Sequence, residues 1–165
     1  MWWYKLNFAY RMALLLAVAG CSTVNIGLLD ENVSAKVSSV SVVETSGRAG
    51  QLYSRELRQA LYLYGQAVPA YEITSSISVS SSSTLSVRGV SSTYKKMTIV
   101  ANFKLTKKGS GDVMLQDTVT ADSTLGTVSS LFGQDQSELH ARDRMAILIA
   151  QRVAQRIQLY FLENA

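Results

Sequence analysis

The chain carries a single cysteine, Cys21, and the position of its thiol indicates a particular chemistry. Cys21 follows Gly20 and the apolar run Met12–Ala19, and the cations Lys5 and Arg11 precede that run. A positively charged start, a short apolar core and a small-residue cleavage site are the marks of a secretory signal. Eight apolar residues are too few to cross a hydrocarbon core about 30 Å thick. We therefore expect the segment before Cys21 to be cleaved.

The string Val18-Ala19-Gly20-Cys21 resembles the bacterial lipobox, in which the cysteine is acylated before cleavage. This resemblance implies that residues 1–20 are a lipoprotein signal peptide and that Cys21 carries covalent lipid, including palmitate. It also implies sorting to the outer membrane, because serine stands at Ser22 where an aspartate would retain the protein in the inner membrane. A buried free thiol and a plain secretory signal are the alternatives. Acyl chains contribute roughly 0.8 kcal/mol per buried methylene, so this anchor needs no transmembrane helix.

Other chemistry finds little support in the sequence. Serine is abundant, but no Gly-x-Ser-x-Gly elbow occurs and His140 is the only imidazole. Beside Glu138 and Arg142 on an expected helix, His140 is expected to be solvated. One histidine and one lipidated cysteine cannot furnish a four-ligand metal site. We therefore predict no enzyme activity, no metal and no cofactor other than the lipid on Cys21.

Length and charge narrow the class of protein. Removal of residues 1–20 leaves 145 of the 165 residues, which is the size of one domain, 21–165. The net charge of +4 falls to about +2 because Lys5 and Arg11 leave with the signal. The mature chain therefore shows no bulk attraction to nucleic acid. It also has no second cysteine for a disulfide, so packing alone must stabilise it.

The first expected elements follow from the pattern of apolar residues. Valines and serines over Lys36–Val43 predict a strand, and Thr45–Gly50 is a turn cluster. Apolar residues at helical spacing predict a helix over Ala49–Tyr64, stopped by Gly65.

Alternation predicts the central strands. Over Tyr71–Val87 the apolar residues Ile73, Ile77, Val79, Leu85 and Val87 fall on odd positions, and every even position from Thr74 onward carries a hydroxyl or a charge. The same parity holds from Met97 to Leu105, with Val100 as the one apolar exception. The glycine-rich turn Lys107–Asp112 then leads to a third strand, Val113–Ala121, which closes a meander. Gly109 and Gly111 can take the positive φ that this turn requires.

A last helix is expected over Gln136–Leu162, after a polar loop from Gly126 to Gly133. The order β-α-β-β-β-α predicts an α+β two-layer sandwich, in which two helices pack on one face of a four-stranded, mostly antiparallel sheet. The other face would be lined by hydroxyls. If elements alternate up and down, the loops 45–50, 88–93 and 124–135 share the end distal to the anchor. Cations would then gather at or near that end, namely Arg48, Arg88, Lys95 and Lys96.

Several strings within residues 41–162 resemble the lipopolysaccharide-assembly lipoprotein family LptE, in its alphaproteobacterial form. The central hairpin is similar at Ser92-Thr93-Tyr94, Phe103-Lys104-Leu105 and Asp117-Thr118-Val119-Thr120. The closing helix is similar at Ser137-Glu138-Leu139-His140-Ala141-Arg142-Asp143-Arg144, Ile149-Ala150-Gln151-Arg152-Val153 and Arg156-Ile157. The sequence departs from many relatives directly after Cys21.

The resemblance implies a non-enzymatic lipoprotein of a Gram-negative cell, anchored at the periplasmic face of the outer membrane. It implies a 1:1 complex with the outer-membrane β-barrel LptD, whose lumen it plugs during lipopolysaccharide transport. A hydroxyl-lined sheet would suit a polar lumen, through Ser76, Ser78, Ser80, Ser82, Thr98 and Asn102. The family's basic lipopolysaccharide-binding loops suggest Arg88, with Lys95 and Lys96 close by. The loop Thr124–Asp135 has no cation, so the family's second basic position does not carry over.

Two alternatives from other classes stay open at this point. An auxiliary periplasmic lipoprotein of an inner-membrane lipid ABC transporter would share the anchor and the fold. A lipoprotein hydrolase would use one of the serines, and would need His140 as its base.

Overall fold

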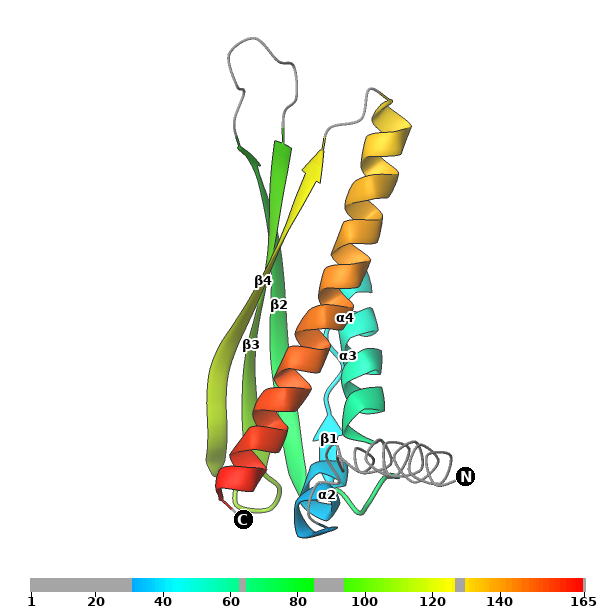
Figure 1. The fold of residues 1–165 in the computed structure, drawn as a ribbon. Helices are drawn as coiled ribbons and strands as arrows, with labels where there is room; N and C mark the ends of the chain where they lie inside the picture. Colours follow the sequence, from blue (N-terminus) through cyan, green and yellow to red (C-terminus); the bar gives the residue numbers. More distant parts are fainter. Residues whose placement is uncertain (1–30, 63–64, 85–93, 127–129, 165) are drawn as a thin grey trace, which may run out of the picture.

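The computed structural model describes residues 31–62, 65–84, 94–126 and 130–164, which form a sheet covered on one face by helices (Figure 1). The elements are α2 (Glu31–Ser38), β1 (Val40–Val42), α3 (Arg48–Leu61), β2 (Tyr71–Thr84), β3 (Tyr94–Lys107), β4 (Val113–Gly126) and α4 (Leu131–Glu163). The strand order is β1-β2-β3-β4, with β1 parallel to β2 and the other neighbours antiparallel. The expected α+β fold with one mostly antiparallel sheet is confirmed.

The three long strands follow the predicted parity. Tyr71 pairs with Lys107 and Thr84 with Tyr94 in the β2–β3 ladder, and Tyr94 pairs with Gly126 across β3 and β4. The odd-numbered residues of β3 from Met97 to Leu105 are each at most 2% exposed, so this face is the core side. The predicted turn is also confirmed, because Gly109 and Gly111 have φ values of 94° and 73°. The end of the expected strand at 85–87 lies outside the described residues.

The helix α3 packs against α4 and covers the lower half of the sheet in the view of Figure 1. Tyr53, Leu57 and Leu61 lie four residues apart and are almost completely buried. Burial of such a side chain stabilises the fold by roughly 1.5–3 kcal/mol. The helix ends at Leu61, where the N–H of Tyr62 donates to Arg58 O at 2.9 Å. The helix α3 therefore begins one residue earlier and ends three residues earlier than the helix predicted over Ala49–Tyr64.

The helix α4 is longer than predicted, with 33 residues or about 50 Å. It begins at Leu131 instead of Gln136, because the Ser130 side chain caps it by accepting a bond from Gly133 N at 3.4 Å. Gly133 is thus a helical residue of the first turn. The buried residues of α4 recur at helical spacing and form one apolar stripe, namely Ala141, Met145, Ala146, Ile149, Ala150, Val153, Ala154, Ile157 and Phe161.

The predicted strand over Lys36–Val43 is wrong over its first half. Residues up to Ser38 belong to α2, and β1 is only three residues long. Val33 and Val37 lie one helical turn apart and are 1% and 2% exposed, so the period of burial here is four, not two. The hydroxyls of Ser38 and Ser39 end the helix by donating to Ala35 O and Lys36 O.

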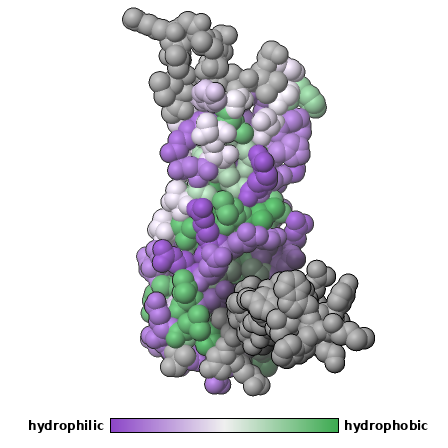
Figure 2. All heavy atoms as spheres, viewed as in Figure 1, coloured by the Kyte–Doolittle hydropathy of each residue, from purple (hydrophilic) through white to green (hydrophobic). Residues whose placement is uncertain are grey.

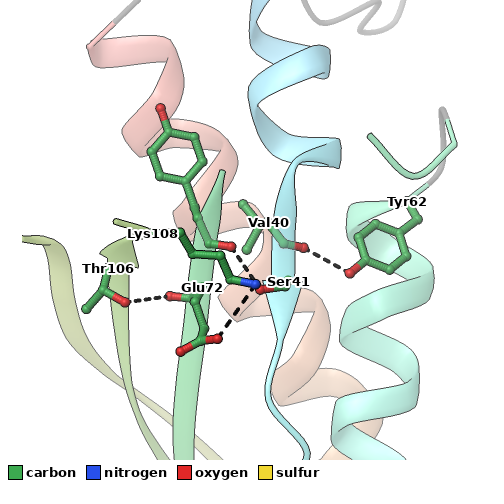
Figure 3. A network of polar contacts seen from close by, with 7 residues as sticks. Val40, Ser41, Tyr62, Glu72, Thr106 and Lys108 are labelled. Carbon is green, nitrogen blue, oxygen red and sulfur yellow. Dashed lines mark hydrogen bonds and ion pairs between the residues drawn. The ribbon is translucent and has the colours of Figure 1, made fainter. Parts of the chain in front are cut away.

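A polar network at the lower end of the sheet fixes β1 between β2 and α3 (Figure 3). The Tyr62 hydroxyl donates to Val40 O at 2.9 Å, and the Ser41 hydroxyl donates to Tyr71 O at 3.0 Å. Lys108, which directly follows β3, places its Nζ 3.9 Å from Oε2 of Glu72 on β2. The bonds from Tyr62 and Ser41 hold β1 at the start of β2, where its three residues pair with Tyr71, Glu72 and Ile73.

The loop Thr45–Gly50 consequently lies midway along β2, which corrects the expectation that it shares the distal end. Thr45 Oγ1 donates to Ser75 O at 3.4 Å, and Ser75 lies nine residues, or about 30 Å, before Thr84. The loop is held tightly, because Thr45 N donates to the buried Ser54 hydroxyl at 3.0 Å. A Cβ atom on Gly50 would stand 2.7 Å from Thr45 O, so only glycine fits there.

Candidate functional site

The adjacent cations Lys95 and Lys96 point to opposite faces of the sheet. Lys95 has the parity of the core-facing residues of β3, and its side chain is 29% exposed. Lys96 has the parity of the outer face, and its side chain is 45% exposed. The sequence places them side by side, but the pleat of the strand separates their charges. They do not form one cationic pocket.

Lys95 ties the distal part of β3 to α4. Its Nζ donates to Glu138 Oε1 at 2.7 Å, and Gln134 Nε2 donates to the same oxygen at 2.9 Å. These two bonds, of which that from Lys95 is the larger influence, lower the pKa of Glu138 below its ordinary value. Lys95 is thus already neutralised by a carboxylate that belongs to the same sandwich.

Lys96 belongs to a second, more exposed cluster. Its Nζ lies 3.2 Å from Asp122 Oδ2, and the Thr98 hydroxyl donates to Asp122 Oδ1 at 2.6 Å. The bond from Thr98, followed by that from Lys96, lowers the pKa of Asp122. Both side chains of this pair are about half exposed, so solvent screens their attraction and a stronger anion can displace Asp122 from Lys96.

The other predicted site residues lie elsewhere or outside the described part of the chain. Arg48 Nη2 forms an ion pair with Asp143 Oδ2 at 3.1 Å, midway along α4, and so does not join Lys95 and Lys96 at the distal end. Arg88 and the lipidation residue Cys21 lie outside the described residues.

The outer face of the sheet is polar over almost its whole length. Ser76, Ser78, Ser80 and Ser82 are exposed along β2, and Thr118, Thr120, Asp122 and Thr124 are exposed along β4. Between them the Thr118 hydroxyl donates to Asn102 Oδ1 at 2.8 Å across β3 and β4. A shallow hollow of about 490 Å³ crosses this face beside Thr74, Asn102 and Gln116. Such a surface satisfies polar neighbours without exposing an apolar patch.

An apolar pair marks the beginning of α4. Leu131 and Phe132 are 81% and 72% exposed, and Figure 2 shows green atoms at this corner, at the upper right of the molecule. Elsewhere in this view purple, hydrophilic side chains are interspersed with further green areas, at the middle and the lower left of the molecule.

The geometry of the described residues shows no catalytic constellation. His140 is exposed on α4, and none of the described hydrogen bonds joins it to a serine. Within the ranges that the structure describes, no group of three or more His, Cys, Asp or Glu side chains could hold a metal ion. No helix in those ranges is long and apolar enough to cross a membrane.

Sequence reasoning missed the partners of these cations. Glu138 lies 43 residues from Lys95, and Asp143 lies 95 residues from Arg48. The acidic residues Glu138 and Asp143 of α4 indicate that this helix can meet basic residues, but only the packing of α4 on β3 and α3 selects the pairs.

The arrangement of elements is shared with bacterial lipoproteins of known structure. A Caulobacter crescentus CB15 protein described as a lipoprotein matches with a TM-score of 0.62 at 17% identity, over 79% of this chain and 96% of that one. The rare lipoprotein B of Shewanella oneidensis matches with a TM-score of 0.59 at 14% identity, over 75% and 96%. A minor lipoprotein of Acinetobacter baumannii gives 0.54 at 14%, over 74% and 94%. At these identities the likeness concerns the fold.

Among curated protein sequences none matches the chain. The family model for LptE, described as lipopolysaccharide-assembly, matches residues 35–157, which include every described strand, α3 and most of α4. The chain therefore belongs to the LptE family of lipopolysaccharide-assembly proteins.

Proposed function

We propose that this protein is a non-enzymatic lipoprotein of the outer membrane that forms a 1:1 complex with the β-barrel LptD and plugs its lumen during lipopolysaccharide assembly. Membership of the LptE family supports the assembly role. The observation that carries the plug is the polar outer face of β2, β3 and β4, on which hydroxyls alternate with a few charged residues. Barrel interiors are polar, and this face can form hydrogen bonds there.

Anchoring through lipid on Cys21 is part of this proposal. The Val18-Ala19-Gly20-Cys21 string supports it. Intact-mass measurement of the purified full-length protein should give a chain that begins at Cys21 and carries the added mass of acyl chains. In the C21S variant both the acyl mass and cleavage after Gly20 should be lost, because that processing acts on the acylated thiol. Unmodified Cys21 in the wild-type protein would contradict the anchor.

The proposed contacts with lipopolysaccharide are Arg88, Lys95 and Lys96. The geometry favours Lys96 over Lys95, because the pair with Asp122 is exposed whereas Lys95 is enclosed by Glu138 and Gln134. A phosphate brings more charge than one carboxylate and can compete for an exposed lysine. Lys96→Ala should weaken binding of lipopolysaccharide by the full-length protein. Lys104→Ala, on the same face but distant from Lys96, is the matched control and should not.

Co-purification tests the partnership. The full-length protein with a C-terminal tag is expressed in a Gram-negative host that also carries its genomic neighbours, and outer membranes are extracted in mild detergent. A large β-barrel at a 1:1 ratio is the expected result. Recovery of the protein with an inner-membrane ATP-driven transporter, or alone, would contradict the proposal.

A further inference from the structure

Among the described residues, no strand pairs with the outer edge of β2 over its distal half. At its start, Tyr71 N donates to Ser39 O at 3.2 Å and Ile73 O accepts from Val43 N at 3.0 Å. The backbone groups of odd-numbered residues of β2 therefore face β1, while those of even-numbered residues face β3. Because β1 ends at Val42, it pairs no further than Ile73.

Beyond Ile73, the described residues give the outward backbone groups of β2 only one hydrogen bond. Ser75 O accepts a bond of 3.4 Å from Thr45 Oγ1. The following edge-facing residues are Ile77, Val79 and Ser81, and their outward N–H and C=O groups have no partner among the described residues. Unpaired backbone groups of this kind are a template for another strand.

At the opposite edge of the sheet, side chains of the protein bond to two of the outward backbone groups of β4. On β4 the even-numbered residues face outward, and Arg152 Nη1 donates to Thr120 O at 2.6 Å. The N–H of Thr118 donates to Asp117 Oδ1 at 2.7 Å. Blocking of edge groups by side chains is how natural sheets avoid unwanted pairing. Side chains thus occupy two backbone groups in the middle of the β4 edge, whereas no described residue bonds to the outward backbone groups of β2 from Ile77 to Ser81.

A groove of about 310 Å³ lies beside the open edge. Its lining includes Ile77 and Val79, which are half-buried, and the loop from Ser46 to Gly50. The exposed cations Arg48 and Arg142 also line it. Arg48 is already paired with Asp143 at 3.1 Å, but no acidic residue lines the groove itself or stands in the first turn of α3, which begins here. Arg142 and the start of α3 therefore favour a negatively charged group next to the apolar floor.

We propose that the β2 edge from Ile77 to Ser81 binds an extended, acidic segment of a partner protein, which adds to the sheet as a fifth strand beyond the end of β1. The segment presents an aliphatic side chain to Ile77 and Val79 and, two residues away on the same side, a carboxylate to Arg48 and Arg142. Backbone bonds supply the affinity in this mode of recognition, and alternate side chains supply the specificity. The inference stands independently of the barrel partnership.

The test uses the full-length ¹⁵N-labelled protein in detergent and an acetylated peptide probe, Thr-Val-Thr-Glu-Thr-Val-Thr-Glu. Amide hydrogen exchange at Ile77, Val79 and Ser81 should slow at least fivefold when the peptide saturates, whereas exchange at Thr120 and Thr124 on β4 should not change. A peptide with lysine in place of glutamate should bind at least fivefold more weakly. Unchanged exchange at the three β2 amides with millimolar peptide would overturn the proposal.

Two proline variants give the matched control. Ser81→Pro removes an N–H from the open edge, and Thr124→Pro removes one from the edge of β4. The first should weaken peptide binding at least fivefold and the second should leave it unchanged. If Ser81→Pro does not fold, the peptide is N-methylated at alternate residues instead. This removes the N–H groups with which the peptide would pair with β2, and binding should weaken in the same way. Equal binding by both variants, or protection that rises with protein concentration without peptide and so indicates a second copy of the chain, would overturn the proposal.

Discussion

Lys95 Nζ donates a hydrogen bond of 2.7 Å to Glu138 Oε1 and so joins the core-facing side of β3 to the second turn of α4. The neighbouring residue Lys96 turns to the other face and pairs with Asp122. One of two adjacent lysines is thus a structural tie within the sandwich, while the other remains at a surface where a ligand can reach it.

The Lys95 tie predicts a pH dependence of stability. The pKa of Glu138 is lowered in the folded protein, so its contribution is present above the ordinary carboxyl pKa and is lost as the pH falls through the lowered pKa. Lys95→Met should reduce the free energy of unfolding by about 0.5–1 kcal/mol at pH 7. In urea denaturation that difference should shrink near pH 3. A difference of the same size at both pH values would show that packing, not charge, is lost.

The buried Tyr53 predicts a loss of folding stability at high pH. Burial raises its pKa to about 12, and the bond with Ser75 only partly offsets this. The neutral phenol is thus favoured in the folded state, so its contribution is present below the unfolded pKa of about 10 and is lost as the pH rises toward 12. Tyr53→Phe should lose less stability than the wild type between pH 9 and pH 11 in thermal unfolding. Parallel profiles would contradict this.

Gly50 predicts a steric limit at the start of α3. A Cβ atom there would meet Thr45 O at 2.7 Å, and Thr45 is itself held by Ser54. Gly50→Ala should destabilise the protein by about 1–3 kcal/mol in urea denaturation. The matched control is Gly126→Ala, whose Cβ would meet nothing within 4 Å. Equal midpoints for the two variants would show that the loop yields without cost.

The direction of the backbone N–H groups along β2 predicts that proline destabilises the protein to different extents at the neighbouring residues Ser80 and Ser81. The N–H of Ser80 faces β3, whereas that of Ser81 faces the open edge, and both side chains are exposed. Ser80→Pro breaks the ladder and should cost about 2 kcal/mol or more, while Ser81→Pro should cost less than about 1 kcal/mol. Calorimetric unfolding of the two variants decides this, and a larger cost for Ser81→Pro would reverse the assigned direction.

The parity of apolar residues was enough to predict β2, β3 and β4, because one face of each strand is buried and the other is polar over a long run. It failed for Val37, which packs with Val33 on one side of α2, because valines four residues apart within a serine-rich stretch fit both periods. The position of Arg48 along the length of the sheet could not be predicted from the sequence either, since it depends on the residue at which β1 ends. That point is set by long-range contacts such as the bond from Tyr62 to Val40 O.

Some features of the candidate surfaces could be predicted from the sequence, and others could not. The hydroxyl face follows directly from alternation in the sequence. The pairs that neutralise Lys95 and Arg48 do not, because α4 contributes Glu138 and Asp143 from far along the chain. The open edge of β2 follows only from the sheet order and the shortness of β1.

Site-specific photo-crosslinking from the outer face tests most directly the claim that this face lies in a barrel lumen. A crosslinker is placed at Ser78 on β2 and, in a second variant, at Gln59 on the exposed side of α3, and the complexes are isolated from outer membranes. The account predicts crosslinks from Ser78 to a large β-barrel protein. An intact complex in which Ser78 gives no crosslink to the barrel, while Gln59 does, would contradict it.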